Sequence, residues 1–256
     1  MRKPLLTGAL LAGAVTAALM TAPTPANAIA HGEDVPIGRY AFSVKLTMTG
    51  IPTADGGRRN SGCSGALVAA RWIITAGHCF RDATGTRVEY PVADLTTATV
   101  GRTDLTDPSR GQLRTVIRVR QSPTADVALA ELDKPVRGIR PIKLGSRPPA
   151  VGTVVRLTGY GSLTSSNPVP ATRLQTGQLT VVQVGDSVTG FHGYAPQPDT
   201  TPCPYDSGGP YFVEKRGGPR LVAVVSNGPS CPHTQVENGA RTDNITGWIT
   251  EVIHSK

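Results

Sequence analysis

Three polar side chains in separate segments of the chain could together perform nucleophilic catalysis. Ser207 lies in the glycine-rich segment Asp-Ser-Gly-Gly-Pro, His78 follows the run Trp-Ile-Ile-Thr-Ala-Gly, and Asp126 precedes the apolar run Val-Ala-Leu. A serine hydroxyl becomes reactive when a neighbouring base accepts its proton and a third group holds that base in the correct tautomer. Each segment alone is typical of an ordinary turn or strand end. Their joint occurrence, in this order and with four cysteines, indicates a catalytic serine.

The amino-terminal residues have the pattern of a secretory signal peptide. Arg2 and Lys3 form a basic segment, residues 5–20 are apolar, and Ala26-Asn27-Ala28 fits a small-x-small cleavage site. A membrane anchor is the alternative, but the apolar run is shorter than the roughly 20 residues that span a bilayer. We therefore expect residues 1–28 to be removed and the product to be secreted and extracellular, without membrane contact.

The four cysteines all lie beyond the predicted cleavage site, at Cys63, Cys79, Cys203 and Cys231. An even number in an exported chain is typical of disulfides, and four cysteines allow three pairings. Pairing neighbours joins Cys63 to Cys79 and Cys203 to Cys231. Zinc is the competing use, but there is no Cys-x-x-Cys pair and no His-Glu-x-x-His motif. We expect two disulfides, with no metal and no cofactor.

Short β-branched runs separated by turn residues recur along the chain. With 29 glycines, 22 prolines and only 17% charged residues, the composition favours many short strands over long helices. Residues 134–152 are rich in Pro, Gly and Arg, which indicates a connection between two β halves. Residues 244–254 have the spacing of a short amphipathic helix through Ile245, Trp248, Ile249 and Val252.

The formal net charge of +8 raises nucleic acid as a partner. Arg114, Arg118 and Arg120 lie at even offsets, on one face of a predicted strand, but the other basic residues are scattered. This pattern is typical of a solvated surface, so we expect no nucleic-acid site.

Taken together, these segments resemble the chymotrypsin-like (trypsin-type) serine peptidases, in a secreted bacterial-type form, and the resemblance extends over the mature chain. The matching segments are Ile29–Asp34, Cys63–Gly65, Thr75–Cys79, Asp126–Leu129, Thr158–Gly161 and Asp206–Pro210, with Cys203, Ser226, Gly228 and Cys231 around the last.

The resemblance implies an all-β fold of two orthogonal six-stranded antiparallel β-barrels, with the active site in the cleft between them. Residues 29–256 would form one peptidase domain, with barrels at about 29–140 and 150–243 and a helix at about 244–254. Ser207 would attack the acyl carbon, His78 would transfer the proton, and Asp126 would orient the imidazole.

The resemblance also implies roles for residues around the triad. The Ile29 amino group would pair with Asp206, and Ser226 would support the aspartate. The N–H groups of Ser207 and of Tyr205 would form the oxyanion hole. Glycine is usual at position 205, and tyrosine lacks its access to positive φ.

Primary specificity follows from the expected pocket residues. Thr201 stands where trypsin-like members have Asp, which disfavours cleavage after Arg or Lys. Gly228 and Gly239 match the glycines of an open pocket, and Asn227 replaces the usual Trp. This pattern predicts a neutral pocket that accepts an apolar or aromatic P1 side chain, the one before the scissile bond.

The predicted function is a secreted, monomeric serine endopeptidase that forms an acyl-enzyme, with protein or peptide substrates and protein inhibitors as partners. The alternative is a catalytically impaired homologue that acts as a binding protein, because Tyr205 replaces the oxyanion-hole glycine.

Overall fold

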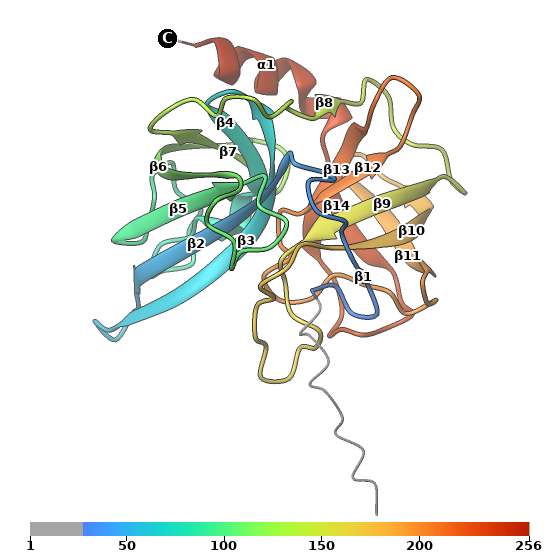
Figure 1. Cartoon of the computed structure of the whole chain (residues 1–256), viewed down its shortest axis with the longest axis horizontal. Helices are drawn as coiled ribbons and strands as arrows, with labels where there is room; N and C mark the ends of the chain where they lie inside the picture. Colours follow the sequence, from blue (N-terminus) through green and yellow to red (C-terminus); the bar gives the residue numbers. More distant parts are fainter. Residues whose placement is uncertain (1–27, 256) are drawn as a thin grey trace, which may run out of the picture.

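The computed structural model describes residues 28–255. The predicted signal peptide, apart from Ala28, lies outside the described residues. Two β-barrels stand side by side, one built from the blue to green part of the chain and one from the yellow to red part (Figure 1).

The first barrel is closed and antiparallel, in the order β2-β3-β4-β7-β6-β5. Its strands are β2 (Ser43–Pro52), β3 (Arg58–Ala69), β4 (Trp72–Ala76), β5 (Leu95–Val100), β6 (Gln112–Gln121) and β7 (Val127–Leu132).

The second barrel closes because β9 pairs with both β10 and β12, in the order β9-β10-β11-β14-β13-β12. Its strands are β9 (Val154–Gly159), β10 (Gln175–Val184), β11 (Val188–Ala195), β12 (Pro210–Val213), β13 (Arg220–Asn227) and β14 (Glu237–Arg241). Two short strands extend this sheet: β1 (Glu33–Asp34) pairs with β10, and β8 (Lys143–Leu144) runs parallel to β13. The predicted architecture of two six-stranded antiparallel barrels is confirmed.

Strand β2 shows how the sequence positions the two barrels. Val44, Leu46 and Met48 alternate along the strand and are buried in the core of the first barrel. Ser43 and Lys45 point the other way and are also buried, against the second barrel. Ser43 Oγ lies 2.9 Å from Thr158 Oγ1, and Lys45 Nζ donates to the Tyr160 carbonyl at 3.1 Å. Both faces of the first half of β2 are therefore buried, one in a core and one between the barrels.

The predicted C-terminal helix is present as α1 (Thr246–His254), which follows a 3-10 turn, η2 (Asp243–Ile245). It lies at the top of Figure 1. Ile245, Ile249 and Val252 are buried in the same apolar cluster as the core of the first barrel, as their spacing predicts. No helix within residues 28–255 is long and apolar enough to cross a membrane.

Candidate active site

The three residues singled out from the sequence lie together in one hydrogen-bonded chain. His78 sits in the 3-10 turn η1 (Gly77–Cys79) directly after β4, Asp126 precedes β7, and Ser207 lies in the loop before β12. His78 Nε2 is 2.9 Å from Ser207 Oγ, and His78 Nδ1 is 2.7 Å from Asp126 Oδ2. With the proton on Nδ1, the imidazole can accept the serine proton at Nε2.

The Asp126 carboxylate is held by several donors. The His78 backbone N–H donates to Oδ1 at 2.9 Å, and Ser226 Oγ donates to Oδ2 at 2.7 Å. Burial alone would raise the pKa of Asp126, but the hydrogen bonds and charge of His78, with the Ser226 hydrogen bond, lower it to about 2. Asp126 is therefore ionised at neutral pH and can stabilise a protonated His78.

The loop that carries Ser207 requires glycine at the next position. Gly208 has a φ of +80°, and a Cβ there would lie 2.0 Å from Thr75 Oγ1. This close approach to β4 brings the serine hydroxyl within reach of the histidine that follows β4.

Tyr205 adopts the left-handed conformation that glycine usually occupies, with a φ of 75°. Neither its N–H nor that of Ser207 donates to another residue within the described range 28–255. Both groups are thus available to hydrogen-bond an external oxygen, as an oxyanion hole requires.

Ser64, on β3 of the first barrel, holds this loop of the second barrel in place. Its N–H donates to the Ser207 carbonyl at 2.8 Å, and its hydroxyl donates to the Tyr205 carbonyl at 3.0 Å. The same hydroxyl accepts from the Tyr160 N–H at 3.0 Å. Sequence reasoning gave Ser64 no role, although it lies in the matching segment Cys63–Gly65.

Asp206 is fully buried, and its carboxylate accepts from the backbone N–H of Gly161 at 2.7 Å and of Cys203 at 3.0 Å. Burial raises its pKa to about 7, while those hydrogen bonds, the charge of Lys45 and the backbone amide of Ile29 act in the opposite direction. The effect of the Ile29 amide places that residue beside the carboxylate, and Ile29 is also fully buried. The ion pair with a free Ile29 amino group stays a prediction.

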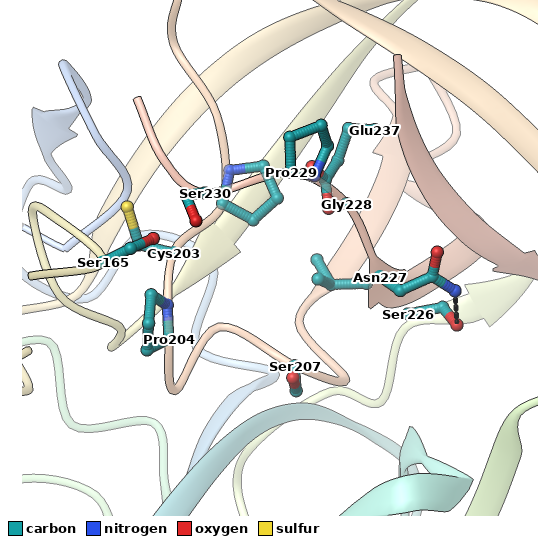
Figure 2. A pocket seen from close by; sticks show the side chains of 12 residues that line it. Ser165, Cys203, Pro204, Ser207, Ser226, Asn227, Gly228, Pro229, Ser230 and Glu237 are labelled. Atoms are coloured by element: carbon teal, nitrogen blue, oxygen red, sulfur yellow. Dashed lines mark hydrogen bonds between the residues drawn. The ribbon is translucent and has the colours of Figure 1, made fainter. Parts of the chain in front are cut away.

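A pocket of about 240 Å³ opens beside the nucleophile (Figure 2). It lies between the Ser207 loop and the end of β13. Figure 2 shows Ser207 at one end and Glu237 at the other, beside Gly228. The lining residues are Ser165, Pro202, Cys203, Pro204, Ser207, Val225, Ser226, Asn227, Gly228, Pro229, Ser230 and Glu237.

Two residues that were expected to bind substrate, Thr201 and Gly239, do not line this pocket, and their role stays a prediction. Thr201 is fully buried and forms a β-bridge with Ala30. Gly239 faces Phe191, Ala223 and Tyr211 instead. The register between β13 and β14 shifts between Val225 and Asn227, so the wall of the pocket comes from an earlier part of β14.

That part of β14 supplies Glu237, a residue that sequence reasoning missed. Glu237 is 3% exposed, and its Oε2 lies 3.0 Å from His233 Nε2. A Cβ on Gly228 would lie 1.8 Å from Oε2, so the glycine leaves room for the carboxyl group. The pocket that was expected to be neutral therefore contains an ionisable group.

Both predicted disulfides are present. Cys63–Cys79 joins β3 to the turn that carries His78. Cys203–Cys231 joins Cys203, which lines the pocket, to the residue that follows Ser230 in another part of the lining.

Comparison with known proteins agrees with the fold and the site. A family model described as Trypsin matches residues 29–249. Transmembrane protease serine 9 of Rattus norvegicus is 31% identical over 258 residues, covering 90% of this chain and 22% of the relative. Beta-fibrinogenase-like of Daboia siamensis is 28% identical over 207 residues, covering 75% of this chain and 78% of the relative. Serine proteinase stubble of Drosophila melanogaster is 25% identical over 255 residues, covering 90% of this chain and 32% of the relative.

The chain thus spans about a fifth of the rat relative, about a third of the fly relative and most of the viper relative. All three are animal proteins, so they give no support to the expected bacterial-type form. The matched family model covers nearly all of the described residues, and the chain therefore belongs to the trypsin family of serine endopeptidases.

Proposed function

We propose that this protein hydrolyses internal peptide bonds of protein or peptide substrates through an acyl-enzyme on Ser207. The observation that carries the proposal is the continuous chain from Ser207 Oγ through the two ring nitrogens of His78 to Asp126, with separations of 2.9 and 2.7 Å. Asp126 is ionised, and Ser226 fixes it in place.

In the acylation step, Ser207 Oγ attacks the substrate carbonyl carbon while His78 Nε2 accepts the hydroxyl proton. The carbonyl oxygen becomes an oxyanion that accepts hydrogen bonds from the N–H groups of Tyr205 and Ser207. His78 then donates the proton to the leaving amine as the C–N bond breaks. Water repeats the sequence on the ester, which releases the acid and restores the Ser207 hydroxyl.

The surroundings of Ser207 support cleavage within a chain rather than at its end. Ser207 lines both the pocket that contains Glu237 and a second pocket of about 330 Å³, whose other lining residues include Met48, His78 and Tyr205. A peptide laid across the serine has space in both directions.

The test is covalent labelling by a fluorophosphonate, which reacts only with an activated serine. We expect one label per chain on Ser207, seen by intact mass and peptide mapping. Ser207→Ala should abolish labelling and lower peptide hydrolysis by roughly 10⁴- to 10⁶-fold. If correctly processed protein fails to label, the alternative of a binding protein with an impaired oxyanion hole takes its place.

Export and activation are part of the proposal. The signal-peptide pattern ends at Ala28, so removal of residues 1–28 would place the new amino group on Ile29, beside Asp206. We expect the secreted protein to begin at Ile29 and to work as a monomer. N-terminal sequencing checks the first point, and a chain with one extra residue before Ile29 should label more slowly. A secreted, fully active form that begins elsewhere would contradict this route.

A further inference from the structure

We propose that Glu237 determines the primary specificity of the pocket beside Ser207, and that it selects a cationic P1 side chain when ionised and a neutral one when protonated. This inference rests on the proposed function, since it concerns the substrate residue that enters that pocket.

The Glu237 carboxyl group lies in the wall of the pocket, where a P1 side chain can reach it. Glu237 lines the pocket at the end away from Ser207 (Figure 2), and its side chain is 4% exposed. Its two oxygens lie 1.8 and 2.6 Å from the point where a Cβ of Gly228 would be, so they fill the wall at the glycine. A long P1 side chain that enters from Ser207 therefore approaches this carboxyl group.

His233 is the hydrogen-bond partner of the Glu237 carboxyl group. His233 Nε2 contacts only Oε2, and Oε1 accepts no hydrogen bond from any residue between 28 and 255. His233 Nδ1 is buried and also lacks a partner in that part of the chain. A protonated imidazole would bury an unpaired N–H, which is costly. The arrangement favours a neutral His233 that donates to Oε2 and leaves Oε1 for the substrate.

Burial and nearby ionisable groups shift the pKa values of Glu237 and His233. Burial, and to a smaller extent the charge of the buried Asp206 carboxylate, together raise the pKa of Glu237 to about 8. Burial lowers the pKa of His233, and the charge of His192 lowers it too, against the opposing effect of the Gln235 backbone. Tyr211, on β12, faces the same region, and burial keeps its phenol protonated. The carboxyl group thus holds a proton in an empty pocket at neutral pH.

The consequence for substrates follows from charge balance. A guanidinium or ammonium group stabilises the ionised carboxylate, so its entry releases the proton of Glu237 to solvent. A neutral side chain leaves the proton in place. Raising the pH should therefore favour cationic P1 residues over neutral ones of the same shape.

The experiment compares two peptides that differ only at P1, one with arginine and one with citrulline, its neutral isostere. The ratio of their kcat/KM values cancels the titration of the triad. We expect the ratio to rise with pH between about 6 and 9 and to reach roughly 10- to 100-fold, the size of a charge-assisted contact. A ratio that stays near or below 1, or that does not change with pH, would overturn the inference.

Three variants separate the roles of Glu237 and His233. Glu237→Gln should remove both the arginine preference and its pH dependence, and Glu237→Asp should restore part of each. His233→Gln should keep the preference, because Glu237 remains. If neither peptide is cleaved by protein that is folded and processed, the proposed function fails, and this inference fails with it.

Discussion

Tyr205 stands where the family resemblance leads us to expect glycine. It occupies a left-handed conformation, which costs a non-glycine residue roughly 1–2 kcal/mol. Its ring lies 5.4 Å from Lys45 Nζ, in a cation–π contact that offsets part of this cost. The loop therefore keeps a glycine-like backbone despite the larger side chain.

Because the backbone is already glycine-like, we expect Tyr205→Gly to change kcat by less than tenfold. The midpoint of thermal unfolding should stay the same or rise slightly, since strain is relieved and one contact is lost. Steady-state kinetics on a peptide substrate check the first point. A hundredfold gain in kcat would show instead that the tyrosine impairs the oxyanion hole.

The end of β9 and the residues that follow it leave room for the buried carboxylate of Asp206. A Cβ on Gly159 or Gly161 would lie 2.0 or 2.2 Å from an oxygen of Asp206. The Gly-Tyr-Gly motif thus lets the backbone approach the carboxylate closely, while Tyr160 fills the space beyond and donates its hydroxyl proton to the Arg102 carbonyl.

We expect Gly161→Ala to displace Asp206 and to lower the free energy of unfolding by about 1–3 kcal/mol, the usual cost of overpacking. Fluorophosphonate labelling should also slow. Gly247→Ala is the matched control, because Gly247 lies in α1 with no atom near its potential Cβ. That change should be neutral or stabilising by about 0.5–1 kcal/mol. Equal effects of the two substitutions would contradict this explanation.

Residues in short sequence motifs could be predicted from the sequence, whereas a residue placed by strand register could not. The triad was predictable because each member lies in a short motif beside a β-branched run, and the disulfides because cysteines are few. Glu237 has no such motif. Its place in the pocket depends on the register shift between β13 and β14 and on a loop through His233. The family resemblance pointed to Gly239 instead, because a match of sequence motifs carries no information on this shift.

At the scale of the whole molecule, Lys45 links the two barrels. It is 6% exposed, and burial lowers its pKa to about 8, although the charge of Asp206 acts to raise it. The unfolded lysine has a pKa near 10.4, so between about pH 8 and 10.4 the native state binds fewer protons than the unfolded state. The contribution of Lys45 to the free energy of unfolding therefore increases with pH across that range and is lost as the pH falls to 8.

We expect this titration to appear in the free energy of unfolding when the Ser207→Ala protein is compared with the Ser207→Ala/Lys45→Met protein. Both carry Ser207→Ala to prevent self-digestion. The advantage of the lysine form should grow by up to about 1.4 kcal/mol per pH unit above pH 8. Chemical denaturation at a series of pH values measures it. Parallel curves would show that Lys45 has an ordinary pKa.

The hydrogen bonds of Ser64 across the two barrels affect the order in which the chain acquires its chemistry. A nascent chain that has folded only its first half holds His78 and Asp126 but has no nucleophile. The second half holds Ser207 on a loop whose carbonyls at Tyr205 and Ser207 still lack their donors. The proposed peptidase activity would thus arise only when both halves have folded and docked, and a half-made chain would have none of it.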